Sequence, residues 1–229
     1  MISCLMVCVN YGDMLRLTLP FNKQMVTNMV VVTVPEDKET LAVCQEFGIK
    51  VLEYRCCFCP YDKEVVKDAT KLFHLSKMIN QGLMYVYENF PDSWYLYLNS
   101  DVILHPHIKT LDVDTLSPEL IYGVNRYLVP TKEDFNKISE GGQIDFSTLG
   151  NHFEDTEGDG IVALGFFQLF KRKIFYDQVY NVPTYDASYS DILFVNKFKN
   201  KGKLEGCHAL HLGKPGVNWC GRVSERWES

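Results

Sequence analysis

Four strand-like runs stand out in the first part of the chain, each rich in aliphatic and aromatic side chains. They lie at Ile2 to Val9, Met29 to Val34, Ile49 to Tyr54 and Trp94 to Leu98. Runs without regular apolar–polar alternation suit central strands covered on both faces, as in a parallel α/β sheet. The first run lacks the basic segment and small-residue cleavage site of a signal peptide, so we interpret it as the first strand.

Helical patterns lie between these runs. In "PEDKETLAVCQEFG", Pro35 and acidic residues stand at the start and Gly48 stands at the end, which are helix start and stop signals. The longest predicted helix spans about Lys63 to Asn89, where apolar residues recur every three or four positions. This β-α-β-α-β-α-β order predicts a Rossmann-like half with any ligand at the carboxyl ends of its strands.

The pattern changes after about Leu104. The segment Lys132 to Gly160 is rich in glycine and acidic residues, and it predicts a long surface excursion because it has too few apolar residues for its own core. A strand at Ile161 to Phe170, a helix around Ser190 to Asn200 and a short strand, "CHALHL", are predicted to follow. We therefore expect one α/β domain with a mostly parallel sheet flanked by helices.

The composition supports one sizeable core. Of the 229 residues, 46% are hydrophobic and 13% aromatic, which excludes a disordered chain. The formal net charge of -6 gives no general attraction to phosphate backbones or anionic lipids, so we expect neither nucleic acid nor a membrane surface as partner. No run reaches the roughly 18 apolar residues of a membrane span, and we expect a soluble, cytoplasmic protein.

The chain contains eight cysteines. Four of them fall in apolar segments and are predicted to be buried, reduced thiols, because no secretion signal indicates an oxidising compartment. In "RCCFCP", Cys57 and Cys59 are close enough to form half of a zinc site. A structural zinc normally needs two spaced pairs, and no second Cys or His pair of standard spacing follows, so zinc is the weaker interpretation.

Two polar segments follow strands at the expected ligand-binding edge. "NYGD", Asn10 to Asp13, comes after the first strand, and Asn99-Ser100-Asp101 comes after the fourth. A carboxylate buried without a partner costs several kcal/mol, so Asp101 either turns the chain at the surface or holds something positive. Two such loops at one edge of a sheet form a crevice that can bind a nucleotide.

The order of these segments resembles a known family. The first strand with its polar loop, then "VVVTVPED", "KLFHLSKMINQGL" and "YLYLNSDVILHP", is similar to the nucleotide-sugar-binding half of GT-A-fold glycosyltransferases of the family-2-like type. The ending, with "GFFQLF", "YDASYSDILFVNKF" and "HLGKPGVNW", is similar to that of small bacterial and viral members. The resemblance covers nearly the whole chain. It implies one GT-A domain over 1–229, with a nucleotide-sugar-binding half over about 1–104 and an acceptor-side half with a closing tail over about 105–229.

The resemblance implies a metal site, because the family's motif is Asp-any-Asp and its last acid, the more direct ligand, is Asp101 here. A hard divalent ion, Mn²⁺ or Mg²⁺, neutralises the charge of a diphosphate leaving group. Asn99 replaces the first acid and removes one charge, and with Ser100 it is expected at the ribose or a metal-bound water. Outside this motif, Asp101 would be an ordinary turn residue.

A late histidine often completes the metal shell in such domains, and "CHALHL" offers His208 and His211. Residues three apart in a strand face opposite sides, so only one of the two faces the site. We choose His211, at the end of the predicted strand. The alternative is a hydrogen-bonded core histidine.

An inverting transferase needs a base that takes the proton of the acceptor hydroxyl. In the resembling family this base is an acid at the start of a late helix, a place that Asp191 takes in "ASYSDILFVNKF", with Asp186 as the second choice. The plain alternative is a first-turn acid without a catalytic role.

Further positions are expected at the donor. Most of them follow from the resemblance. The plain alternatives are a solvated lysine for Lys77 and an amide satisfied by neighbouring backbone for Gln168. The expected positions are Asn10, Tyr11 and Asp13 at the base and ribose, Lys77 and Asn80 on the long helix, Gly165 and Gln168 near the sugar, and Trp219 with Arg222 or Lys214 in the closing tail.

These expectations combine into one leading hypothesis. It is a metal-dependent, inverting hexosyltransferase that moves a sugar from a nucleoside-diphosphate sugar, with UDP favoured, to a glycan or other hydroxyl acceptor. The first alternative is a sugar-1-phosphate nucleotidyltransferase, which normally starts with a glycine-rich phosphate loop, whereas "VNYGDMLRL" holds one glycine. The second is a non-catalytic module that binds a nucleotide or glycan or is stapled by zinc.

Overall fold

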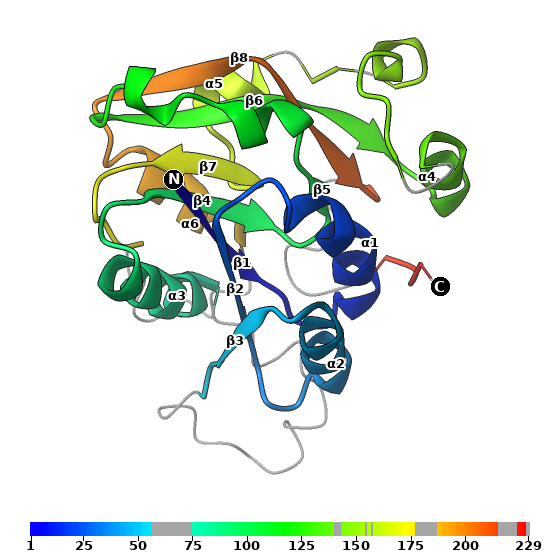
Figure 1. Cartoon of the computed structure of the whole chain (residues 1–229), viewed down its shortest axis with the longest axis horizontal. Coiled ribbons are helices and arrows are strands. Elements are labelled where there is room, and N and C mark those ends of the chain that lie inside the picture. Colours follow the sequence, from blue (N-terminus) through cyan, green and yellow to red (C-terminus); the bar gives the residue numbers. More distant parts are fainter. Residues whose placement is uncertain are drawn as a thin grey trace.

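A curled eight-stranded sheet forms the centre of the molecule, with helices on both faces (Figure 1). The strands follow the order β3-β2-β1-β4-β7-β6-β8-β5. The computed structural model describes residues 1–55, 75–139, 143–153, 155–156, 158–176, 187–214 and 224–227. The predicted α/β class with a mostly parallel sheet is confirmed.

Four parallel strands build the first half of the sheet. They are β1 (Ile2–Val7), β2 (Asn28–Thr33), β3 (Lys50–Glu53) and β4 (Trp94–Asn99). β1 lies between β2 and β4, and Val7 pairs with Asn99, so these two strands end side by side at their carboxyl edge. All four predicted strands are confirmed, with bounds that differ by a residue or two.

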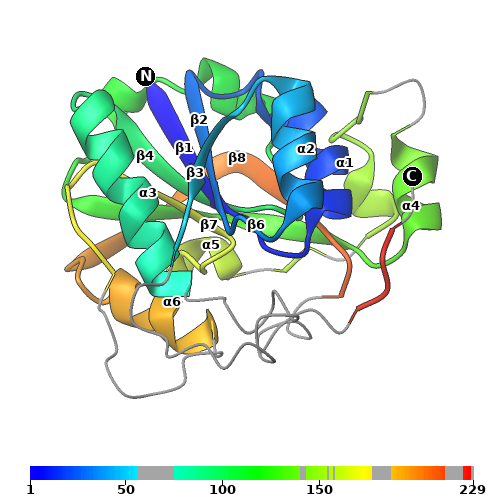
Figure 2. The ribbon, with the colours of Figure 1, turned by 90° about the horizontal axis from the view of Figure 1, so that it is seen from below.

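Alternate side chains of β1 enter two cores on opposite faces of the sheet. Cys4 and Met6 pack with residues of α1 (Gly12–Asn22) and α2 (Lys38–Phe47), whereas Leu5 and Val7 pack with residues of α3 (Leu75–Asn89). Figure 2 shows α3 and α2 lying apart from each other, with the first strands of the sheet between them. Burial on both faces explains why the strand sequences do not alternate.

The capping signals of α2 are confirmed. The Asp37 side chain accepts a hydrogen bond from the backbone N–H of Thr40, and Gly48 ends the helix in the left-handed conformation, with φ 66°. The predicted long helix is confirmed from Leu75 onward, and its expected first part lies outside the described residues.

The second half of the sheet is mixed. It contains β5 (Val102–Ile103), β6 (Leu120–Val129), β7 (Phe167–Phe170) and β8 (Asn200–Leu212). β7 is antiparallel to both β4 and β6, while β8 runs parallel to β6 and antiparallel to β5. The 13-residue β8 contains the predicted short strand "CHALHL" as its end, and β6 was not predicted at all.

One strand prediction was partly wrong. The run Ile161 to Phe170 was expected to be one strand, but α5 (Asp159–Val162) occupies its start and only Phe167–Phe170 pairs in the sheet. Ile161 and Val162 are 61% and 45% exposed, so these β-branched residues lack the core contacts that stabilise a strand. The predicted late helix is confirmed as α6 (Ala187–Val195), which lies a few residues earlier than expected.

The segment Lys132 to Gly160 packs on the domain, in line with the prediction that it is not a unit of its own. It contains α4 (Lys132–Ile138) and the short turn η6 (Leu149–Asn151), and it follows two other 3-10 turns, η3 (Pro106–Thr110) and η4 (Val113–Thr115). Phe135 and Leu149 are buried in one cluster with Met14, Leu210 and Trp227. This cluster therefore joins the excursion and the C-terminal segment to α1 and β8.

Two further expectations concern cysteines and membranes. Cys4, Cys8, Cys44 and Cys207 are free and buried, as predicted, and burial raises the pKa of Cys207 to about 11. Cysteines 56, 57, 59 and 220, including those of the proposed half zinc site, lie outside the described residues. None of the helices in the described segments has the length and apolar character needed to span a bilayer.

Candidate active site at the carboxyl edge of the sheet

The loop after β1 and the loop after β4 lie at the same edge of the sheet. The hydroxyl of Thr18, on α1, donates to the backbone carbonyl of Ser100 over 2.8 Å, which ties the helix after β1 to the turn after β4. Asn10 has a positive φ of 61°, the conformation in which the chain turns from β1 toward α1. The two polar segments are therefore neighbours, as the parallel arrangement predicts.

The first loop is held by residues from distant parts of the chain. The backbone N–H of Asn10 donates to Asp37 Oδ2 over 2.6 Å. Asp13 is buried, and its Oδ2 accepts a 2.7 Å hydrogen bond from the backbone N–H of Trp227. Tyr11, half-buried at the start of α1, packs against two of the core clusters. The segment 224–227 thus lies against the loop that was expected to receive the nucleotide base.

Asp101 and His211 face each other at the end of β4. His211, near the end of β8, is in register with Val102, and its Nε2 lies 3.4 Å from Asp101 Oδ1. Both side chains are largely buried, with 17% exposure for Asp101 and 9% for His211. Asp101 Oδ1 is buried and makes no hydrogen bond within the described part of the chain, so the 3.4 Å contact is electrostatic. Asn99 and Ser100 precede Asp101 and are half-buried and buried.

An arginine that the sequence analysis missed completes this group. Arg126, on β6, places Nη1 2.6 Å from His211 Nδ1 and Nε 2.8 Å from Asp159 Oδ2. The rings of Phe166 and His211 stack with centroids 5.9 Å apart, and the guanidinium lies 4.5 Å from the Phe166 centroid. Arg126 was missed because β6 was not recognised as a strand of the sheet.

The Asp191 carboxylate lies against Gly165, the residue before Phe166. A Cβ added to Gly165 would overlap the Asp191 carboxylate, so the absence of a side chain at Gly165 makes room for it. Asp191 as a residue is partly exposed, but its Oδ1 is buried and makes no hydrogen bond among the described residues. Burial raises the pKa of this carboxyl to about 7.

Tyr97 connects the two carboxylates electrostatically. Burial raises the pKa of this phenol well above its usual range, and the charges of Asp191 and Asp101 add to the effect. Gly165-Phe166 connects them structurally, because the Phe166 carbonyl accepts a 3.1 Å hydrogen bond from Asn99 N while Gly165 touches Asp191. The structure therefore brings Asp101 and Asp191, which are 90 positions apart, to one region at the carboxyl edge.

Gln168 and Asn80 support this region from within the protein. Gln168 is fully buried, donates to the Ala163 carbonyl over 3.0 Å and accepts a hydrogen bond from the Tyr176 hydroxyl. Asn80 donates to the backbone carbonyl of Tyr176 over 2.9 Å and accepts from its N–H over 2.7 Å. Tyr176 stacks on Phe194 of α6 with ring centroids 4.0 Å apart. These amides are engaged in holding Tyr176 and α6.

The other positions expected at the donor or the acceptor are half-buried or exposed on neighbouring elements, or lie outside the described residues. Lys77 is half-buried on α3, and Lys214 is exposed after β8. His208, the histidine not chosen, stacks on Tyr127, with ring centroids 5.0 Å apart, and lies 3.3 Å from Asp155. Trp219, Arg222 and Asp186 lie outside the described residues.

Only some of the side chains at the candidate site are suited to bind a metal cation. Asp101 fits, because its buried Oδ1 lacks a hydrogen-bond partner among the described residues and a hard divalent ion prefers such an oxygen. The described part of the chain contains no cluster of three or more His, Cys, Asp or Glu side chains arranged for a metal. His211 fits less well, since its Nδ1 faces a guanidinium, which can only donate hydrogen bonds.

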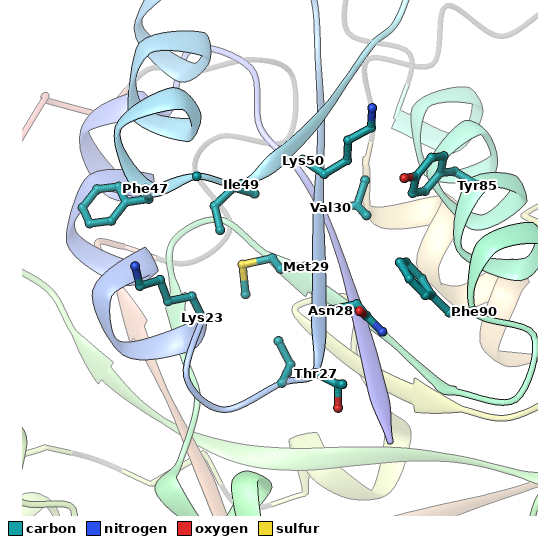
Figure 3. Close-up of a pocket in the computed structure, with 12 residues that line it drawn as sticks. Lys23, Thr27, Asn28, Met29, Val30, Phe47, Ile49, Lys50, Tyr85 and Phe90 are labelled. Carbon is teal, nitrogen blue, oxygen red and sulfur yellow. The ribbon is translucent and has the colours of Figure 1, made fainter.

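A cavity of about 400 Å³ lies elsewhere in the fold (Figure 3). It opens at the amino ends of β2 and β3, between the end of α2 and the end of α3, and is lined by Lys23, Met29, Phe47, Lys50, Tyr85 and Phe90. This edge of the sheet is opposite to the one that carries Asp101. The cavity is therefore separate from the candidate active site.

The chain matches no protein-family model, and no curated protein matches its sequence. Solved structures with some likeness include a 4-diphosphocytidyl-2C-methyl-D-erythritol synthase, at 12% identity and a TM-score of 0.44 over 98% of this chain and 93% of that one. A cytidylyltransferase from Leptospira borgpetersenii serovar Hardjo-bovis gives 15% and 0.39 over 89% and 75%. A glycosyltransferase involved in glycosylation of the major capsid of PBCV-1 gives 11% and 0.30 over 74% and 59%.

Proposed function

We propose that the protein is a transferase acting on a nucleotide-activated sugar, and specifically a glycosyltransferase that inverts the anomeric centre. One observation carries this proposal. Asp101 and Asp191 each keep a buried carboxylate oxygen without a hydrogen bond among the described residues, and both charges act on the buried phenol of Tyr97. Because burying a carboxylate oxygen without a hydrogen bond is unfavourable, two such oxygens at the ligand-binding edge of an α/β sheet favour a catalytic role.

Asp191 suits the role of general base. A carboxyl with a pKa of about 7 is substantially ionised at neutral pH and still basic enough to accept a proton from an acceptor hydroxyl. As the acceptor oxygen bonds to the anomeric carbon, its proton passes to Asp191. The bond from that carbon to the phosphate oxygen breaks, and its electron pair leaves with the nucleoside diphosphate. Attack opposite the leaving group inverts the configuration.

Asp101 suits the leaving-group side of the site. Mn²⁺ or Mg²⁺ bound at this carboxylate would neutralise charge on the departing diphosphate. The loop Asn10 to Asp13 follows β1 at the same edge, and we expect it to contact the nucleoside part of the donor, with the Tyr11 ring beside a UDP base. The roles of Lys77, Trp219 and Arg222 at the donor, and a glycan or other hydroxyl compound as acceptor, stay predictions.

A screen of ligand binding tests the proposal. UDP-, GDP-, dTDP- and CMP-sugars, each with and without Mn²⁺, would be tested by thermal shift and calorimetry on the intact protein. Asp101→Ala would be compared with Glu119→Ala, which removes an exposed acid before β6. We expect one nucleotide to stabilise the protein in a manner that needs both Mn²⁺ and Asp101. Binding of none of the four would contradict the proposal.

Product analysis separates the two transferase classes. Incubation of the selected donor with sugar acceptors should release a nucleoside diphosphate and form a glycoside. A sugar-1-phosphate nucleotidyltransferase would instead act in a second incubation, with a nucleoside triphosphate and a sugar 1-phosphate, where it would form the nucleoside-diphosphate sugar and release pyrophosphate. Pyrophosphate release without glycoside formation would replace the proposed reaction with this alternative, in which Asp191 has no assigned role.

A further inference from the structure

The imidazole of His211 is held on three sides. Its Nδ1 lies 2.6 Å from Arg126 Nη1, and its ring stacks on Phe166 with an angle of 18° between the planes. Its Nε2 lies 3.4 Å from Asp101 Oδ1. The ring is largely buried, so solvent water does not compete as a hydrogen-bond partner for either ring nitrogen.

Arg126 is itself fixed in place. Its Nε donates to Asp159 over 2.8 Å, and its guanidinium stacks on the same Phe166 ring. The side chains of Arg126 and Asp159 are only 14% and 18% exposed. Turning Arg126 away from His211 would leave the poorly solvated Asp159 carboxylate without its ion-pair partner. The direction of the hydrogen bond at His211 Nδ1 is therefore set by a rigid donor.

This contact determines the tautomer of His211. A guanidinium has five N–H donors and no acceptor, so Nδ1 must accept the hydrogen bond and cannot carry a proton. The proton of the neutral ring then lies on Nε2. A histidine that ligates a metal through Nε2 needs a lone pair there, and its other nitrogen usually donates to a carboxylate or carbonyl. The arrangement at His211 is the reverse.

We propose that His211 acts in the site as an N–H donor, with its tautomer set by Arg126, and not as a metal ligand. The Nε2–H bond lies beside Asp101 without making an ordinary hydrogen bond to it, and is thus available to a phosphate oxygen of a nucleoside diphosphate held at Asp101. The cationic Arg126 strengthens this donor by polarising the ring from Nδ1. The choice of a phosphate oxygen rests on the proposed function, whereas the tautomer does not.

The tautomer can be measured directly. Long-range proton–nitrogen NMR spectra of the intact protein, with ¹⁵N-labelled histidine, distinguish protonated from unprotonated ring nitrogens. The chain has six histidines, and the His211 signals would be assigned by their loss in His211→Gln. We expect a protonated Nε2 and an unprotonated Nδ1 in the wild-type protein. A protonated Nδ1 would overturn the proposal without any variant.

Two substitutions test the role of Arg126 as a positioning residue. In Arg126→Gln the amide oxygen can accept from Nδ1–H, so we expect a large part of the population to change to the other tautomer. Arg126→Lys keeps a side chain that only donates, so we expect it to retain the wild-type tautomer. A merely structural role would perturb both variants alike and would leave the tautomer unchanged. Equal tautomer populations in both variants would therefore contradict the assignment to Arg126.

Ligand titrations decide between donor and metal ligand. Mg²⁺ alone should leave the Nε2 proton in place, whereas UDP with Mg²⁺ should shift the Nε2–H signal. Loss of the Nε2 proton on adding Mg²⁺ would make His211 a metal ligand and overturn the proposal. Calorimetric binding of UDP without a shift would refute the phosphate partner. If UDP did not bind at all, the proposed function would fail with that partner, and the wild-type spectrum would still decide the tautomer.

Discussion

The carboxylate of Asp191 occupies the space in which a side chain on Gly165 would begin. Replacing Gly165 with alanine should force this carboxylate to move, because the added methyl group would overlap Oδ2 and Cγ. We expect Gly165→Ala to lower the transfer rate at least tenfold, about 1.4 kcal/mol in the barrier, with donor binding at Asp101 largely retained. Steady-state kinetics with calorimetry checks this.

Gly150→Ala is the matched control, since among the described residues its added methyl group would meet only Tyr127 Oη, at 3.4 Å. Its kinetics should equal those of the wild type. Equal rates for wild type and Gly165→Ala would show that Asp191 does not need its present position.

Asp191→Asn should stabilise the folded protein at neutral pH while abolishing transfer. Burial raises the pKa of Asp191 to about 7, so at pH 8 the folded state bears the full cost of an ionised, poorly solvated carboxylate. From the shift, this cost is at most about 4 kcal/mol. Asparagine removes the charge with nearly the same volume. Chemical denaturation of both proteins at pH 4.5 and pH 8 measures the difference.

The pH dependence has a definite sign. Between about pH 4, where the unfolded carboxyl ionises, and about pH 7, where the folded one does, the folded state binds more protons. Asp191 therefore makes wild-type stability fall as pH rises through this range, and the loss is complete above pH 7. The advantage of Asp191→Asn should be small at pH 4.5 and full at pH 8. An equal difference at both pH values would rule out this titration as the cause.

The transfer rate should follow the ionisation of the same group. If Asp191 is the base, kcat/KM rises about tenfold per pH unit below its pKa of about 7 and levels off above it. Rates measured from pH 5.5 to 8.5, with donor binding followed calorimetrically at each pH, separate this effect from a change in affinity. A flat profile would argue against Asp191 as the base.

Tyr176→Phe should destabilise the region beneath α6. The change removes the hydroxyl that donates to Gln168 and leaves a fully buried amide oxygen unpaired, at a cost of about 1–3 kcal/mol. The ring stacked on Phe194 is preserved, so packing should change little. Tyr85→Phe, at the half-buried ring beside Lys50, is the control and should lie within about 0.5 kcal/mol of the wild type by denaturation.

The cavity at the amino edge gives a test of where the nucleotide binds. Lys50 lines it and lies 5.6 Å from the centroid of the Tyr85 ring, at the edge opposite to Asp101. Lys50→Ala should therefore leave nucleotide affinity within a factor of two, whereas Asp101→Ala should lower it more than tenfold. The reverse result in calorimetry would move the nucleotide site to this cavity.

Local sequence patterns were sufficient for the first half of the fold. The strands β1 to β4 and the ends of α2 follow from residues close together in the chain, because apolar runs, acidic first turns and a terminal glycine act over a few positions. The same reasoning placed the two polar loops at one edge, since parallel strands end together. The apolar runs of the second half were harder to assign to strands, because the sheet there is mixed and Ile161 and Val162 are apolar without being buried.

The candidate site could be predicted only in part from the sequence, for a different reason. The sequence singled out Asp101, His211, Gly165 and Asp191 one by one, but only the tertiary structure determined which of them touch. Arg126 reaches His211 across 85 positions because β6 and β8 pair in one particular register, and Asp191 meets Gly165 because α6 packs over β7. Register and packing depend on the free energy of the whole core, so residue type and local spacing do not reveal them.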